Sequence, residues 1–254
     1  MGKSIRAALT ASLWHLLISF FVVTVTAWFV LAFWYPYPYR YLAGGFFLLT
    51  ILFCVDIVVG PLLTFVVFDD RKPRQELFFD ITIIGIIQAS AMIYGLWSVY
   101  QARPVYLVHE VDRFVVVSAA DIDRNDLSNA LPEFQKLPFS GVRLIGVRDS
   151  VNQQEFLQSI ELALAGKDIS MQPNRWQKLS AENKIQILKN AKPLHVLMSR
   201  SKSEYNLISN WLDTSNRKKE ELVYLPVVAR NKTWVAVLDI EKLDILNYFP
   251  IDGF

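Results

Sequence analysis

The sequence predicts a bundle of three transmembrane helices followed by an α+β domain. Of its 254 residues, 53% are hydrophobic, which is too apolar for an ordinary soluble domain. The charged residues gather after residue 101, so we place a transmembrane domain at residues 1–102 and a folded domain with its own core at residues 103–254. The apolar residues before that point form three runs of membrane-spanning length: Ala7–Phe33, Leu42–Phe68 and Leu77–Tyr100.

The first run has the positively charged start of a signal peptide, at Lys3 and Arg6. It is much longer than the roughly 7 to 15 apolar residues of a cleavable signal, and bulky aromatic residues occupy the place of a cleavage site. We therefore predict an anchor that is not cleaved. The aromatic and proline-rich residues 34–41 then suit the lipid headgroup region, where proline stops the helix.

Basic residues near the span ends predict the orientation. The charged loop at residues 69–76 has three of them, and together with Lys3 and Arg6 they outweigh Arg40 and Arg103 on the other side. We therefore expect the N-terminus and this loop to be cytoplasmic. Everything from Gln101 onward, including the C-terminal domain, would then lie on the outer side of the membrane.

The middle run carries Asp56 and the pair Gly60-Pro61 in its interior. An ionised carboxylate at this depth costs at least about 2.5 kcal/mol against lipid, so Asp56 should face protein, be neutral or have a polar partner. Pro61 removes the hydrogen bond to the carbonyl of Ile57, and Gly60 lets a neighbouring group approach the backbone closely. A simpler interpretation is that Asp56 only holds the three helices together and that Gly60-Pro61 is only a kink.

Depth along the helices predicts the partners of Asp56. At a rise of about 1.5 Å per residue, Asp56 lies roughly 18 Å from the cytoplasmic end of its span, and Ser19 and Gln88 lie at similar depths. We expect one or both to bond to Asp56 and tie the spans together. His15 is shallower and could meet Asp80 or face the cytoplasmic headgroups. We interpret it as an interhelical polar residue with satisfied hydrogen bonds.

The C-terminal domain shows both strand and helix patterns. Predicted strands are Val105–Val111, Arg113–Ser118, Leu144–Val147, Val223–Ala229, Trp234–Ile240 and Ile245–Phe249, the last three joined by turns at Asn231-Lys232 and Glu241-Lys242. Pro226 should place its strand at a sheet edge or a bulge. Helices are predicted at residues 151–165 with a capping box from Ser150, at Ala181–Asn190 capped by Ser180, and after Ser201.

Helical spacing predicts which side chains of these helices face the core. They are Phe156, Leu157, Ile160 and Leu164 in the first helix, Ile185 and Leu188 in the second, and Tyr205, Ile208, Trp211 and Leu212 in the third.

The residues give little sign of chemistry. His109 and His195 lack metal-ligand spacing, and no serine lies in a nucleophile-elbow context. The acidic stretch of Asp112, Asp121, Asp123 and Asp126 lacks the glycine and terminal glutamate of a calcium loop, so we interpret it as a solvated loop or as helix caps. The near-balanced net charge of +2 does not favour nucleic-acid binding. We expect no catalytic residue, cofactor or metal, and Cys54 alone permits no internal disulfide.

Particular stretches match a known family. They are Tyr39-x-Tyr41-Leu42-Ala43-Gly44-Gly45, Val55-Asp56-x-x-x-Gly60-Pro61-Leu62-Leu63-Thr64, Tyr94-Gly95-Leu96, Val99-Tyr100-Gln101-Ala102-Arg103-Pro104 and Glu110-Val111-Asp112-Arg113-Phe114. Together they resemble the TfpX/TfpZ family of type IV pilin accessory proteins. The resemblance implies an inner-membrane protein that acts as a pilin-specific chaperone, helping the major pilin to be assembled, with the pilin, the lipid bilayer and the pilus assembly machinery as partners.

This resemblance and the residue analysis together give a binding hypothesis. The bundle would offer a lateral groove to the apolar helix of the pilin, and the outer domain would contact the pilin head. The residues expected to take part are Asp56, Ile57, Gly60, Pro61, Ser19, Gln88, Glu110, Asp112 and Arg113.

Two alternatives remain open. One is a membrane enzyme that modifies the pilin, for example by glycosylation, which would need a constellation of carboxylates or basic residues beside a lipid-linked donor. The other is an envelope sensor, against which the short cytoplasmic loop at residues 69–76 counts.

Overall fold

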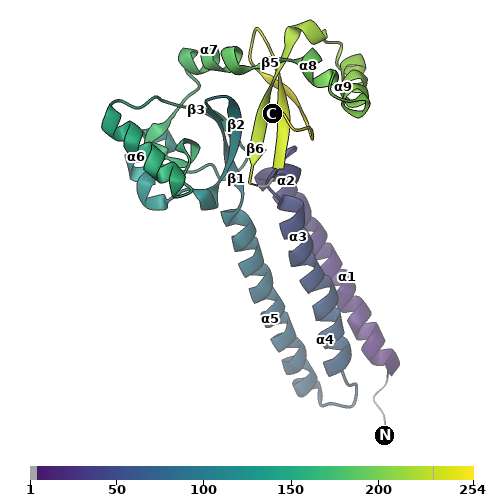
Figure 1. Ribbon diagram of the computed structural model, residues 1–254. Helices are drawn as coiled ribbons and strands as arrows, with labels where there is room; N and C mark the ends of the chain where they lie inside the picture. Colours follow the sequence, from purple (N-terminus) through teal and green to yellow (C-terminus); the bar gives the residue numbers. More distant parts are fainter. Residues whose placement is uncertain (1–4, 231) are drawn as a thin grey trace. The chain divides into compact units, whose positions relative to one another are not determined.

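The computed structural model describes residues 5–230 and 232–254. The chain divides into two compact units, Met1–Arg103 and Pro104–Phe254. Most of their helices and strands are labelled in Figure 1. The sequence predictions for Lys3 and Asn231 concern residues outside the described ranges.

Within the described ranges, the first unit has three helical segments that are long and apolar enough to cross a membrane: Ile5–Trp34, Gly45–Val67 and Arg74–Gln101. They confirm the three predicted runs, and they lie alongside one another in Figure 1. The second segment begins later than predicted because Gly44 adopts a left-handed conformation with φ of +74°. This conformation separates the short helix α2 (Tyr39–Leu42) from the span.

Two of the spans contain a π-helical turn. In chain order the elements are α1 (Ile5–Phe29), η1 (Val30–Trp34), α3 (Gly45–Cys54), η2 (Val55–Val59), α4 (Gly60–Val67) and α5 (Arg74–Gln101). The turn η2 directly precedes Gly60-Pro61, where the proline cannot donate to the preceding turn. The predicted irregularity is therefore a π-turn, a feature that often occurs at functional sites.

One end of the bundle is held by an aromatic and aliphatic cluster. Val30, Trp34 and Tyr35 of the first span pack with Leu49 and Val99 of the other two. The Tyr35 hydroxyl donates to the carbonyl of Val99 at 3.1 Å. All three spans are thus joined at this end by direct side-chain contacts.

The second unit is built on a mixed sheet of eight strands, counted over the residues that the structure describes. The strands are β1 (Pro104–Glu110), β2 (Arg113–Ser118), β3 (Arg143–Val147), β4 (Trp176–Gln177), β5 (Lys192–Pro193), β6 (Leu222–Ala229), β7 (Lys232–Asp239) and β8 (Ile245–Phe249). Their order is β4-β3-β1-β2-β6-β7-β8, and β5 pairs with β6. The β1–β3 and β2–β6 pairs are parallel, and the other pairs are antiparallel. The predicted α+β class is confirmed.

The prediction that Pro226 marks a sheet edge or a bulge is wrong. Strand β6 lies inside the sheet and pairs with β7 without a register shift, with Pro226 opposite Val235. On its other side, β5 pairs as far as Tyr224 and β2 begins to pair at Val227. Pro226 lies between these two short ladders, where a missing N–H removes no bond to either of them.

Four α-helices accompany the sheet within the described residues: α6 (Gln153–Leu164), α7 (Ala181–Asn190), α8 (Leu194–Met198) and α9 (Lys202–Ser215). Ser180 and Asn183 form a reciprocal capping box at α7, as predicted for the start of that helix. The predicted core face of α7 is wrong, since Ile185 is 66% exposed and Leu188 is 44% exposed. Asn183 and Ile187 are buried instead.

Two clusters among the described residues contribute to the core of this unit. The first contains Tyr106, Phe134 and Trp176, whose rings contact one another near β1 and β4. The second contains Ile208 of α9 and Tyr224 of β6, with Trp211 and Leu212 packed against it as predicted. Tyr205, which was expected on the same side, is half exposed.

Two residues of the acidic stretch, Asp121 and Asp123, act as helix caps. The Asp121 carboxylate accepts from the backbone N–H of Ser118, and that of Asp123 accepts from the N–H of Asn125, each at the start of a 3₁₀ turn. No group of three or more potential metal ligands occurs within the described residues.

Candidate functional site

A lateral cavity of about 380 Å³ opens among the three spans of the first unit. It is lined by α1, by the π-turn η2 and by α5 through His15, Ile18, Ser19, Val22, Val23, Asp56, Gly85, Gln88, Ala89, Met92 and Ile93. We call this cavity the span groove. Its surface is almost entirely apolar, with four polar side chains.

His15 closes one part of the span groove and joins the three spans. Its Nε2 lies 2.6 Å from Oε1 of Gln88, and its Nδ1 lies 2.5 Å from Oγ1 of Thr64. Because an amide oxygen only accepts, Nε2 carries a proton and donates to Gln88. The interpretation of His15 as a satisfied interhelical residue is confirmed. Its predicted partner was wrong, since Asp80 is paired with Lys72 at 2.6 Å.

Gly60 makes this arrangement possible. The amide of Gln88 lies so close to Gly60 that a Cβ atom there would overlap its Nε2. Ser12 adds a further link between spans by donating to the carbonyl of Pro61 at 2.8 Å. The predicted close approach to the backbone at Gly60 is confirmed, and the group that approaches is a side chain.

Asp56 faces the span groove and is 5% exposed. Ser19 and Gln88, its predicted partners, line the same groove, but neither makes a hydrogen bond to it. Gln88 is engaged by His15 instead. The Oδ2 atom of Asp56 has no hydrogen-bond partner among the described residues. The expectation that Asp56 faces protein is confirmed, and the expectation that it bonds to the neighbouring spans is wrong.

The other predicted binding residues do not line the groove. Ile57 is half-buried, and Gly60 and Pro61 are buried within the helix packing. In the second unit, the predicted residues lie at the β1–β2 turn. There Arg113 donates to Asp112 at 2.8 Å, and Glu110 accepts from the backbone N–H of Ser170 at 3.2 Å. Burial raises the pKa of Glu110.

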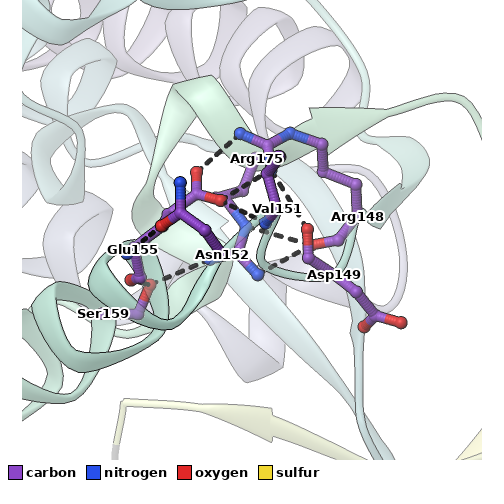
Figure 2. A network of polar contacts seen from close by, with 7 residues as sticks. All are labelled: Arg148, Asp149, Val151, Asn152, Glu155, Ser159 and Arg175. Carbon is purple, nitrogen blue, oxygen red and sulfur yellow. Dashed lines mark hydrogen bonds and ion pairs between the residues drawn. The ribbon is translucent and has the colours of Figure 1, made fainter.

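Helix α6 is fixed to the second unit through its polar side, by the network drawn in Figure 2. Arg148 makes a two-pronged pair with Glu155, at 2.7 and 3.0 Å. The buried Arg175 donates to the hydroxyl of Ser159 at 2.9 Å and twice to the carbonyl of Arg148. The cap is Asn152, which accepts from the N–H of Glu155, so the predicted capping box from Ser150 is wrong.

The apolar side of α6 therefore points outward, opposite to the prediction. Ser159 is the buried residue of this helix. The exposed fractions are 55% for Phe156, 52% for Leu157, 43% for Ile160 and 85% for Leu164, and Val151 beside the helix is 77% exposed. We call these five residues the α6 face. An apolar face of this kind is typical of a binding surface.

The Arg148–Glu155 pair predicts a dependence of stability on pH. The hydrogen bonds from Arg148 hold the pKa of Glu155 at about 2, below its ordinary value. A lowered pKa in the folded state contributes stability that is present above the ordinary pKa and is lost as the pH falls toward 2. We expect Glu155→Gln to lower the free energy of unfolding by about 1 kcal/mol at pH 7. This difference between the variant and the wild type should disappear as the pH falls from 5 to 2.

Thermal unfolding of the full chain in detergent, at a series of pH values, measures this difference. The control is Glu133→Gln, because the partner of Glu133, Lys178, is 81% exposed. This variant should unfold at the same temperature as the wild type at every pH. A difference for Glu155→Gln that stays constant down to pH 2 would contradict the assigned role.

The histidines of the second unit do not form a site. His109 is fully buried beside the ring of Phe114, and neither of its nitrogens has a hydrogen-bond partner among the described residues. Burial lowers its pKa to about 4, so it is neutral at physiological pH. His195 is exposed on α8.

The fold and the groove define a class: an anchor of three membrane-crossing helices with a lateral cavity, followed by a mixed α+β unit. Comparison with known proteins then gives the family. The sequence model of the family "Fimbrial assembly protein FimB" matches residues 3–44 of this chain. The chain is 37% identical over 242 residues to the fimbrial assembly protein of serogroup I from Dichelobacter nodosus. The aligned region covers 94% of this chain and 93% of that relative.

A second relative, the fimbrial assembly protein of serogroup E1 from the same organism, is 36% identical over the same shares of both chains. The chain belongs to the FimB family of fimbrial assembly proteins. The comparisons support the predicted link to pilus assembly. The family that they name is FimB and not TfpX/TfpZ. No solved structure matches the chain.

Proposed function

We propose that this protein is an inner-membrane accessory protein that binds the major subunit of a type IV pilus and promotes its stability or its assembly. It acts as a chaperone for that subunit and not as an enzyme. Its N-terminus and the loop at residues 69–76 face the cytoplasm, and the second unit faces the periplasm. The role of the relatives in fimbrial assembly, which their names state, supports the proposal.

The span groove is the observation that carries the proposal. Helices in lipid associate through close packing and polar contacts, because lipid tails are as apolar as the helix surface. A groove bordered by α1 and α5 offers an apolar partner helix contacts on more than one side. It also offers a small polar area around Asp56 and Ser19. A pilus subunit held in the membrane by an apolar helix fits such a groove.

The α6 face supplies a second contact, outside the lipid. We propose that it binds the soluble head of the same subunit. The polar anchoring of α6 by Arg148 and Arg175 supports this role, because it holds the helix in place without using its apolar side chains. Binding would bury these side chains, and each well-buried apolar anchor of an interface contributes disproportionately to affinity.

Copurification tests the function. The intact protein is extracted in mild detergent from cells that make the major pilus subunit, and the subunit recovered per molecule of protein is measured. We expect recovery well above that obtained with an unrelated three-span membrane protein. Recovery no higher than with that protein would overturn the proposal.

A charge placed on the α6 face tests the second contact. We expect Leu157→Glu to lower subunit recovery about fivefold or more, because the interface would have to desolvate a carboxylate. Leu157 is 52% exposed, so the thermal unfolding of the protein should not change. The control is Gln154→Glu, which adds the same charge to an exposed position of α6 outside the α6 face. Equal recovery for both variants would show that the face does not contact the subunit.

A further inference from the structure

Asp56 is a buried polar residue of the span groove with an oxygen atom that lacks a hydrogen-bond partner within the described residues. Its side chain is more than nine-tenths buried, and its Oδ2 atom has no hydrogen-bond partner in the described parts of the chain. By contrast, the imidazole of His15 and the amide oxygen of Gln88 bond to each other. The groove is therefore polar at two places, around His15 and around Asp56. At His15 the polar atoms bond to each other, whereas Oδ2 of Asp56 bonds to no described residue.

The surroundings of Asp56 make the missing bond costly. Most of the other residues that line the groove are apolar, among them Ile18, Val22, Val23 and Met92. A carboxyl group without a hydrogen bond is disfavoured in such an apolar setting, and at this depth a bilayer offers no water. Polar groups inside membrane helices commonly mark functional positions for this reason.

We propose that the Asp56 carboxyl recognises a hydrogen-bond donor, an amine or a hydroxyl, that the bound subunit carries within its apolar helix. This inference rests on the proposed function, and it adds the chemistry that the groove selects. A helix without a donor would leave the carboxyl unpaired and buried. A helix with a donor at the matching depth removes that cost, so Asp56 sets both the choice of helix and its depth in the groove.

Other occupants fit less well. A lipid acyl chain fills the apolar part of the groove but brings no donor to the carboxyl. A second copy of this chain would bring a second unpaired carboxyl of its own. The subunit helix is the occupant that resolves the unpaired group while filling the groove.

Three variants test the proposal through the amount of subunit copurified per molecule of protein. Asp56→Leu removes the acceptor, and Asp56→Asn keeps an acceptor oxygen but no charge. The control is Asp80→Asn, on the same bundle, because Asp80 already pairs with Lys72 and does not line the groove. We expect Asp56→Leu to lower recovery about tenfold. The Leu variant should accumulate like the wild type, because Oδ2 has no intramolecular bond to lose.

Asp56→Asn separates the two kinds of donor. A hydroxyl can still donate to the amide oxygen, so recovery would stay within about twofold of the wild type. An amine loses its countercharge, so recovery would fall as far as with the Leu variant. Asp80→Asn should recover the subunit like the wild type in either case.

The outcomes separate this inference from the proposed function. If the wild type recovers the subunit and Asp56→Leu recovers it equally well, the inference is wrong and the function stands. The inference is also wrong if Asp56→Leu reduces only the amount of protein, since Asp56 would then hold the bundle together. If the wild type recovers no subunit, or recovers a second copy of itself through the groove, the proposed function fails as well.

Discussion

Gly85→Phe is expected to abolish recovery of the pilus subunit while the protein itself accumulates normally. Gly85 lines the span groove, and a Cβ atom at this position would have no heavy atom within 4 Å. An aromatic ring attached there extends into the space that the partner helix would occupy. Glycine is also an unfavourable residue inside a helix, so the substitution should not weaken α5 itself.

Ser90→Phe is the control for this prediction. Ser90 is an exposed residue of α5 that does not line the groove, so the variant adds similar bulk to the same helix. We expect it to recover the subunit like the wild type. Equal recovery from Gly85→Phe and Ser90→Phe would show that the groove is not the binding site, even if the protein does bind the subunit.

Arg175→Ala is expected to release α6 from the second unit. Arg175 is 3% exposed and makes three hydrogen bonds, to Ser159 and to the carbonyl of Arg148. Its loss removes charge-assisted bonds and leaves buried acceptors unpaired, at a cost of about 3 kcal/mol. Hydrogen exchange of the α6 amides in the full-length protein should therefore accelerate about 100-fold.

The control for this variant is Lys178→Ala, because the Lys178 side chain is 81% exposed and its ion pair contributes little. It should leave the exchange of α6 unchanged. Since the α6 face is built on this anchoring, Arg175→Ala should also lower subunit recovery. Protected α6 amides in the Arg175→Ala variant would mean that other contacts hold the helix.

Local patterns in the sequence were sufficient for most of the fold. The three spans follow from uninterrupted apolar runs, and the β1–β2 hairpin and the meander from β6 to β8 follow from β-branched residues between turns. The Ser180 cap of α7 follows from side-chain chemistry within four residues. Each of these signals is contained in a short stretch of chain.

The failures concern information that is not local. Amphipathic spacing shows that α6 has two different faces, but it does not say that Arg148 and Arg175 cover the polar one. A proline is tolerated at position 226 inside the sheet because β5 stops pairing with β6 before it and β2 begins to pair with β6 after it. Strong helix and strand patterns thus predicted the elements better than their surroundings.

The same limit applies to the candidate site. Depth counting correctly put Asp56, Ser19 and Gln88 at one level of the bundle, and all three line the groove. It did not give the rotation of each helix about its axis, which decides that Gln88 meets His15. The glycine at position 60 was the best available signal for that contact, because a side chain needed its space.

Site-specific photocrosslinking from the span groove tests the central claim most directly. A photoreactive residue is placed at Ile93, which lines the groove, or at the adjacent Tyr94, which does not. The two side chains have nearly equal exposure, 69% and 70%, so access to the crosslinker is matched. We predict a crosslink between position 93 and the apolar helix of the major pilus subunit, and none from position 94. Crosslinks to the subunit from both positions alike, or from neither, would contradict the account.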